Sequence, residues 1–278
     1  MLRNQAGEVL TVKAYIMTDL EGCAGIPSWH DYGAPEHRWY EYARELVTLE
    51  TSAAVQGCLD AGVDEVLVVD GHGHGAINPV LLHPEANLLF GRPIRYPFGC
   101  DESFDAAMMV GQHAKSNTDG GHLSHTGSFS VEEETINGIS VGEMGVNMLF
   151  CAYFGVPTVL VCGDLAAAEE AEALVPNMET AAVKEGLKRG PATGLTGAEN
   201  SRHNGAATHL HPTKARELIR ERARRGIERA AEIEPFWLEP PYERTLVMRK
   251  TEDEPQKVGR SRADDLLELL TRTPYEWD

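Results

Sequence analysis

The sequence has no closely spaced pair of cysteines and no long apolar run. Its five cysteines are scattered and none belongs to a CxxC motif, so a disulfide framework is not expected and buried thiols are favoured. They are Cys23, Cys58, Cys100, Cys151 and Cys162. No apolar stretch approaches the ~20 residues that cross a bilayer, and the first residues lack the apolar core of a signal peptide. We therefore expect a cytoplasmic protein without a membrane partner, rather than a secreted solute-binding protein.

Basic residues are scarce as well. The 278 residues include 25 Lys and Arg against 43 Asp and Glu, a formal net charge of -18. The whole excess lies in residues 1–200, with 10 basic and 28 acidic residues, whereas residues 201–278 hold 15 of each. Such a field repels nucleic acid and attracts metal ions and ammonium groups. A role of the acidity in solubility alone is an equally good interpretation, but a nucleic-acid partner is not expected.

Strand-like and helix-like segments alternate along the chain, which indicates an α/β fold. We predict a mostly parallel sheet flanked by helices, with a smaller C-terminal α/β portion. Strands are expected at Val12–Thr18, Glu65–Asp70, Ala106–Gly111, Thr158–Cys162 and, late in the chain, Thr245–Met248. Helices are expected at Arg38–Ala61, Gly142–Phe154, Leu165–Leu174 and Pro212–Ile233, and a glycine-rich loop at Gly190–Thr208.

The first predicted strand ends in two carboxylates. The apolar run Ala14–Met17 is followed by Asp19 and Glu21, one residue apart. Residues i and i+2 of a strand point to the same side, so both carboxylates could face one site if the extended geometry continues to Glu21. Hard carboxylate oxygens suit divalent cations. Taken alone, the motif is more typical of a capped turn with solvated acids.

The second and third apolar runs also end in residues that can bind metal. His72 and His74 follow the second run, and His113 follows the third. Imidazole is a common zinc ligand, and the glycines beside His72 leave room for a bound ligand. His72 is favoured over His74 because it lies closer to the strand end, with exposed turn histidines as the alternative. Three such endings predict one shared site at the carboxyl edge of the sheet.

Two further residues carry weaker signals. His125 lies in a polar loop, where an imidazole can act as a general acid or base but often has no such role. Glu143 opens an apolar helix, where acids are common because of the helix dipole alone. A serine hydrolase built on Ser128 or Ser130 is disfavoured, since no GxSxG motif is present. His83, His203, His209 and His211 could also bind metal, but a loop role is favoured for His209 and His211.

In their order and spacing, these segments together resemble the M55 metallopeptidase family, although no single motif is decisive. The resemblance covers about residues 12 to 188. The matching stretches are Asp19–Pro27, Asp70–His72, Gly111–Ala114, Leu123–His125, Val141–Asn147, Leu174–Asn177 and Thr180–Lys184. Three features depart from the family pattern. They are an extension of about ten residues at the N-terminus, an insertion around Gly190–His211, and a poorly matching tail from about residue 235.

The resemblance implies two zinc ions bound by five residues, with one more histidine in the active site. The ligands fall on Asp19, Glu21, His72, His113 and Glu143, and the additional histidine on His125. This replaces the helix-start interpretation of Glu143 and does not make His74 a ligand. Which carboxylate bridges the ions stays open. The resemblance further implies a homodecamer of two stacked rings around a channel, and release of N-terminal D-amino acids from short peptides.

The resulting hypothesis is a zinc-dependent aminopeptidase that hydrolyses short peptides through a hydroxide bridging two metal ions. His125 would stabilise the oxyanion or pass a proton to the leaving amine. Residues 1–164 would form the metal-binding catalytic domain, and residues 165–278 a portion for substrate channel and assembly. One alternative is a metal-dependent hydrolase of a non-peptide amide or ester. The other is a non-catalytic peptide-binding component of a transport system. Stereochemical preference, peptide length and physiological metal remain open.

Overall fold

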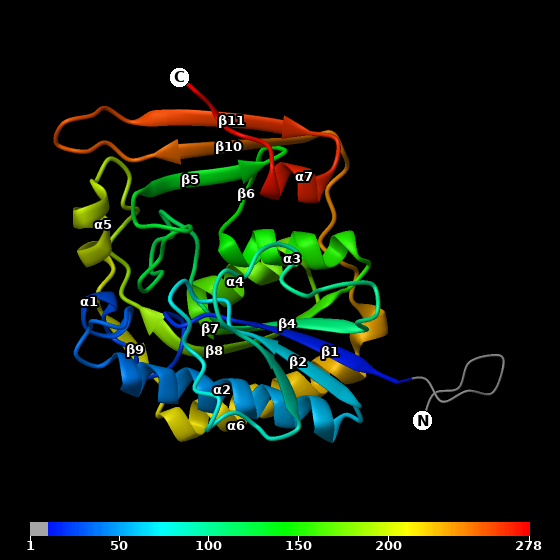
Figure 1. Cartoon of the computed structure of the whole chain (residues 1–278). Helices are drawn as coiled ribbons and strands as arrows, with labels where there is room; N and C mark the ends of the chain where they lie inside the picture. Colours follow the sequence, from blue (N-terminus) through cyan, green and yellow to red (C-terminus); the bar gives the residue numbers. More distant parts are fainter. Residues whose placement is uncertain (1–10) are drawn as a thin grey trace.

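The computed structural model describes residues 11–278, which form two β-sheets with helices on and between them (Figure 1). The predicted class is confirmed, because the larger sheet is mostly parallel and is flanked by helices. The smaller sheet is antiparallel. The predicted N-terminal extension and the leader-free start lie outside the described residues. In the described range, no helix is both long and apolar enough to span a bilayer.

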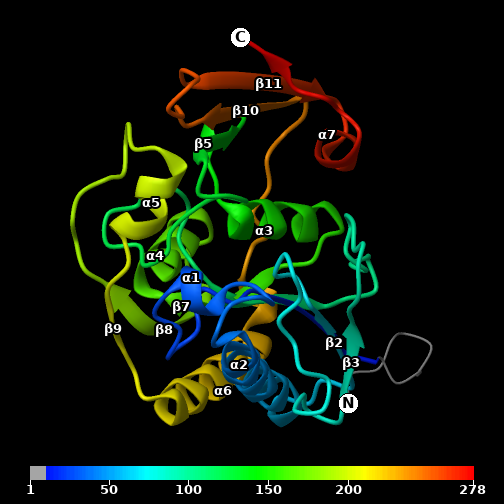
Figure 2. The same cartoon turned by 60° about the vertical axis from the view of Figure 1, so that its left-hand side comes forward.

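The larger sheet has seven strands. They are β1 (Lys13–Thr18), β2 (Glu65–Val69), β3 (Ala86–Leu89), β4 (Ala106–Gln112), β7 (Thr158–Asp164), β8 (Glu179–Gly186) and β9 (Ala207–His209). Their order is β3-β2-β1-β4-β7-β8-β9, and only β9 runs antiparallel to its neighbour. One face is covered by α2 (Tyr40–Asp60) and α6 (Pro212–Glu228), the other by α3 (Glu143–Tyr153) and α4 (Leu165–Leu174), as Figure 2 shows.

The smaller sheet lies beyond α3, so that this helix runs between the two sheets (Figure 1). Its strands are β5 (Val131–Ile136), β6 (Ile139–Ser140), β10 (Tyr242–Met248), β11 (Lys257–Ala263) and β12 (Glu276–Trp277). Helix α7 (Leu266–Thr271) packs against β10, β11 and α3. Each sheet takes strands from both sides of residue 164. The division of the chain at that residue stays a prediction.

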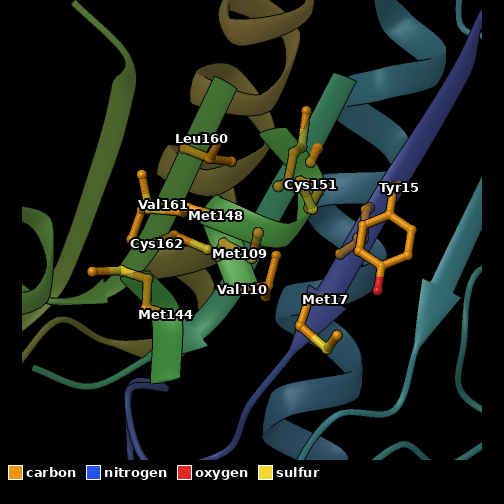
Figure 3. Packing of buried hydrophobic residues seen from close by; sticks show 14 of the residues in the cluster. Tyr15, Met17, Met109, Val110, Met144, Met148, Cys151, Leu160, Val161 and Cys162 are labelled. Carbon is orange, nitrogen blue, oxygen red and sulfur yellow. The ribbon is translucent and has the colours of Figure 1, made fainter. Parts of the chain in front are cut away.

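The core lies between the central strands and the helices on both faces. Every residue of β4 and β7 is buried. Strands covered on both faces need continuous apolar runs, which is the pattern that made them recognisable in the sequence. Figure 3 shows Met144, Met148 and Cys151 of α3 close to Met109 of β4 and Leu160 of β7, all members of one buried cluster. All five cysteines are buried and unpaired, as expected.

The local predictions succeed where segments are long and apolar. Helix α4 has the predicted bounds, and α2 and α3 begin and end within two residues of theirs. The predicted helix from residue 212 ends at Glu228 and is followed by a 3-10 turn at Ala230–Glu232. The expected loop at 190–208 was wrong in part, because it contains α5 (Gly197–His203) and the start of β9. A short helix, α1 (Trp29–Tyr32), was also missed.

Candidate metal centre

The strand order gathers three of the predicted residues at one point. From β1 the sheet extends through β2 and β3 on one side and through β4, β7 and β8 on the other, so the direction of winding reverses between β1 and β4. Ligands of open α/β sheets bind beyond the carboxyl ends of the strands at such a reversal. Asp19 follows β1, His72 follows β2 and His113 follows β4.

Close backbone packing fixes the turn after β1. The Gly22 N–H donates a hydrogen bond of 2.8 Å to the carbonyl oxygen of Gly111. A Cβ atom on Gly22 would lie 2.0 Å from the carbonyl oxygen of Gln112, and one on Gly111 would lie 2.2 Å from that of Asp19. Gly111 also has a φ of 76°. Side chains are excluded at both glycines, so the turn lies directly on the end of β4 and carries Asp19 to the site.

A first set of donor atoms comes from Asp19, Glu21 and His72, all buried. One ligand atom of each lies within 4.8 Å of the others, and His72 Nε2 is 3.5 Å from Glu21 Oε1. Asp19 Oδ2, Glu21 Oε2 and His72 Nδ1 have no hydrogen-bond partner in residues 11–278. Buried carboxylate oxygens without a partner are costly, and a bound cation would satisfy them.

A second set comes from His113, His125 and Glu143, again with ligand atoms within 4.8 Å of one another. The Nε2 atoms of His113 and His125 lie 3.6 and 3.5 Å from Glu143 Oε1. Their Nδ1 atoms lie 3.0 and 2.9 Å from the carbonyl oxygens of Ala114 and Leu123. A carbonyl accepts, so we assign the proton to Nδ1. Nε2 is then the nitrogen that each ring can offer to a metal.

Asp19 joins the two sets, because its Oδ2 lies 3.2 Å from His113 Nε2. All six residues predicted from the sequence therefore meet in one place. His74 does not join them: it is exposed and lines a separate cavity with Asp70. The other four histidines considered as metal ligands contact protein groups instead. His83 contacts Gln56, His203 a backbone carbonyl, and His209 and His211 accept backbone N–H groups.

The carboxylates make the site strongly attractive to positive charge. Burial lowers the pKa of His72, but Glu21 more than compensates and raises it to about 9. Burial likewise opposes the protonation of His113, and Glu143 and Asp19 raise its pKa to about 10. Burial and the charge of Glu21 raise the pKa of Asp19 to about 8. Groups that hold protons this firmly also attract a divalent cation, which competes for the same lone pairs.

His125 differs from the other two histidines. Burial, together with the neighbouring positive His113, lowers its pKa. Its ring stacks on that of His113, with centroids 3.9 Å apart and planes at 12°. A neutral imidazole keeps one nitrogen with a lone pair, which can accept a proton.

Three groups behind the site, of which Lys184 and Glu50 are buried, hold the loop that follows Asp19. The Lys184 ammonium donates to the carbonyl oxygen of Glu21 and, at 3.3 Å, to that of Ile26. Glu50 Oε1 accepts from Ala24 N–H at 2.9 Å. The third is His209, whose Nδ1 accepts a hydrogen bond of 3.1 Å from the Gly25 N–H. Lys184 lies in one of the segments that carried the resemblance, but its role needed the structure.

A cavity of about 250 Å³ adjoins the centre and reaches the smaller sheet. Asp19 and Glu143 line one part of it, and Glu134 of β5 and Arg244 of β10 line another. Its other side chains are Met17, Thr18, Tyr96, Phe98, Gln112, Val146 and Asn147. Sequence reasoning missed Glu134 and Arg244, because no local pattern brings together residues 110 positions apart.

Comparisons with known proteins indicate the family of the chain. Residues 12–256 match the model of the M55 peptidase family, described as D-aminopeptidase, so the match extends beyond the expected limit of residue 188. The chain is 35% identical to the D-aminopeptidase of Bacillus subtilis (strain 168) over 237 residues, which is 83% of this chain and 78% of the relative.

A solved structure is also similar: the Zn-dependent D-aminopeptidase DppA from Bacillus subtilis, a self-compartmentalizing protease. The TM-score is 0.78 at 28% identity, and the match covers 95% of this chain and all of the other. With most of its length matched by the family model, the chain belongs to the M55 peptidase family of D-aminopeptidases and is a metallo-aminopeptidase.

Proposed function

We propose that the protein is a zinc-dependent aminopeptidase that removes an N-terminal D-amino acid from short peptides. One observation carries the proposal. Three carboxylates and three histidines converge where the winding of the sheet reverses between β1 and β4, and several of their buried oxygen and nitrogen atoms have no partner in the described residues. The names of the similar proteins, which are a D-aminopeptidase and a zinc-dependent one, support the choice of metal and substrate.

Asp19, Glu21, His72, His113 and Glu143 would hold two zinc ions. Carboxylate oxygens and imidazole nitrogens are ligands that zinc takes in catalytic sites. Asp19 is the best candidate for the bridging carboxylate, because it belongs to the first set and contacts His113 of the second. When bound, zinc lowers the pKa of water from 15.7 to roughly 7 and polarises the scissile carbonyl.

His125 would hold or move a proton during the reaction. Its bond from Nδ1 to the Leu123 carbonyl oxygen fixes the ring, and its free Nε2 faces Glu143 at 3.5 Å. Once Nε2 has taken up a proton, it can donate that proton to the leaving amine or donate a hydrogen bond to the oxyanion. His125 belongs to the second set of donor atoms, so it could instead be a metal ligand. The zinc content of a variant without this imidazole distinguishes a proton-carrying residue from a ligand. We expect His125→Ala to lose activity and keep both ions.

Short substrates are supported by the size of the cavity. Its volume of about 250 Å³ is below the roughly 300–1,000 Å³ of pockets for drug-sized ligands. The carboxylates around the centre would attract the substrate ammonium group. Likeness to a self-compartmentalizing protease supports a homo-oligomer, a decamer by the family pattern, and residues 165–278 would contribute to its channel. A cytoplasmic location remains part of the proposal.

Turnover assays test the proposal. The zinc-loaded protein is offered D-Ala-D-Ala, L-Ala-L-Ala and p-nitrophenyl phosphate at equal concentrations. We expect hydrolysis of the D-dipeptide at the highest kcat/KM. Preference for the phosphate ester would identify a different metal-dependent hydrolase. Tight binding of peptides without turnover would instead favour the peptide-binding component of a transport system.

A further inference from the structure

An ion pair from the smaller sheet reaches into the cavity of the metal centre. Arg244 Nε donates a hydrogen bond of 2.7 Å to Glu134 Oε1. Both residues line the cavity that Asp19 and Glu143 also line. The Glu134 side chain is 6% exposed and that of Arg244 is 20% exposed. The guanidinium is therefore held at the cavity wall and retains limited access to solvent.

The guanidinium keeps unused hydrogen-bond donors. Arginine carries five N–H groups, and Nε is the only nitrogen of Arg244 with a hydrogen bond to another described residue. The ring of Tyr275 lies 5.3 Å from the guanidinium carbon on a second side. Glu134 and Tyr275 thus fix the plane of the group, while its two terminal nitrogens remain available. Their fork geometry suits a carboxylate, which it can bind with two parallel hydrogen bonds.

Arg244 is also the single cationic side chain among the described residues that line this cavity. The other charged side chains in the lining are carboxylates: Asp19, Glu134 and Glu143. Away from the metal centre, Arg244 is therefore the positive group of this lining that an anionic end of a substrate would meet. Phe98 and Val146 add apolar surface to the same lining, and a charged contact is stronger beside apolar surface than in bulk water.

The dimensions fit a dipeptide. A sphere of 250 Å³ is about 8 Å across, and an extended chain spans roughly 3.5 Å per residue. With the scissile carbonyl at the metal centre, the carboxylate of the second residue would lie about one residue length away, within the cavity that Arg244 also lines.

We propose that Arg244 binds the C-terminal carboxylate of a dipeptide substrate, with Glu134 as its positioning residue. The inference rests on the proposed function and narrows it, since it makes a free carboxylate one residue beyond the scissile bond a requirement for efficient hydrolysis. The competing explanation is that the ion pair only ties β5 to β10.

The test compares D-Ala-D-Ala with its C-terminal amide, using the zinc-loaded enzyme. A charged hydrogen-bonded contact predicts that kcat/KM for the free acid exceeds that for the amide roughly 10- to 100-fold. In Arg244→Gln the ratio of kcat/KM for the acid to kcat/KM for the amide should fall to about 1. D-Ala-D-Asp amide, whose carboxylate is on the side chain, distinguishes an acidic side chain from the chain terminus and should be hydrolysed as slowly as the neutral amide.

Three further variants keep the result interpretable. Arg262→Gln removes an exposed arginine of the same sheet, paired with Glu243, and should keep the full preference for the acid. Glu134→Gln should raise KM for the acid more than KM for the amide, because the guanidinium is no longer oriented. Arg244→Gln combined with Glu134→Gln leaves no unpaired buried carboxylate and should lose the preference while retaining zinc.

Three outcomes would overturn the inference. They are equal hydrolysis of acid and amide by the wild type, an equal loss on both substrates in the zinc-bound variants, or faster hydrolysis of the D-Ala-D-Asp amide than of the free acid. Absence of hydrolysis of any peptide by the zinc-loaded wild type would refute the proposed function itself, and the role of Arg244 with it.

Discussion

Glu50 lies on α2 behind the metal centre and has a buried side chain. Its Oε1 accepts the Ala24 N–H, and its Oε2 has no hydrogen-bond partner among residues 11–278. Burial raises its pKa from 4.5 to about 7. Between pH 4.5 and pH 7, Glu50 keeps its proton in the folded protein but has lost it in the unfolded chain. The resulting stability is fully present below pH 4.5 and is lost as the pH rises through 7.

The magnitude follows from the two pKa values. The difference between 7 and 4.5, at 1.36 kcal/mol per pKa unit, opposes folding by about 3 kcal/mol at high pH. Most of this, about 2 to 3 kcal/mol, develops between pH 5 and pH 8. Glu50→Gln keeps an acceptor for the Ala24 N–H but cannot ionise. Relative to the wild type, the free energy of unfolding of the variant should therefore rise by about 2 to 3 kcal/mol from pH 5 to pH 8.

Urea unfolding at both pH values, with a chelator present to remove metal binding from the comparison, measures this difference. The reasoning would be refuted if the free energies of unfolding of variant and wild type differed by the same amount at pH 5 and at pH 8. Glu50 would then be ionised in the folded protein throughout this range, as the partner of the Lys184 ammonium.

Two further substitutions test how the metal centre is supported. Gly22→Ala places a Cβ atom 2.0 Å from the Gln112 carbonyl oxygen and should lower both Tm and zinc affinity, whereas Gly73→Ala meets nothing within 4 Å and should change stability by less than about 0.5 kcal/mol. Equal Tm values for the two variants would contradict this. Lys184→Met removes the donor to the Glu21 carbonyl and should weaken zinc binding roughly 10- to 100-fold in a competition titration, unlike Lys188→Met at an exposed position. An unchanged zinc affinity would show that this contact does not support the site.

The sequence predicted the central elements because their signals are local. Strands β4 and β7 are buried throughout, so each is a continuous apolar run. Strand β8 was missed because its Ala-rich sequence includes charged residues, and β11 because it alternates charged residues with Gly and Ser. The only local cue for α5 is the capping box of Thr196 and Glu199.

The residues of the site also fall into those with a local sequence signal and those without one. Asp19, Glu21, His72 and His113 were found because each lies at or just beyond the end of an apolar strand. Glu143 needed the family resemblance, since an acid at a helix start is common for other reasons. The pairing of β5 with β10 is a tertiary contact, so no local signal could place Glu134 and Arg244 together in the cavity.

The central claim is that these side chains bind the zinc ions on which peptide hydrolysis depends. The most direct measurement is zinc content and D-Ala-D-Ala hydrolysis in the same samples of wild type, His113→Ala and, as a control, His74→Ala, which changes an exposed histidine outside the site. We expect two zinc ions per chain and full activity in the wild type and the control, and loss of both zinc and activity in His113→Ala. A zinc-free His113→Ala protein with full activity would contradict the account.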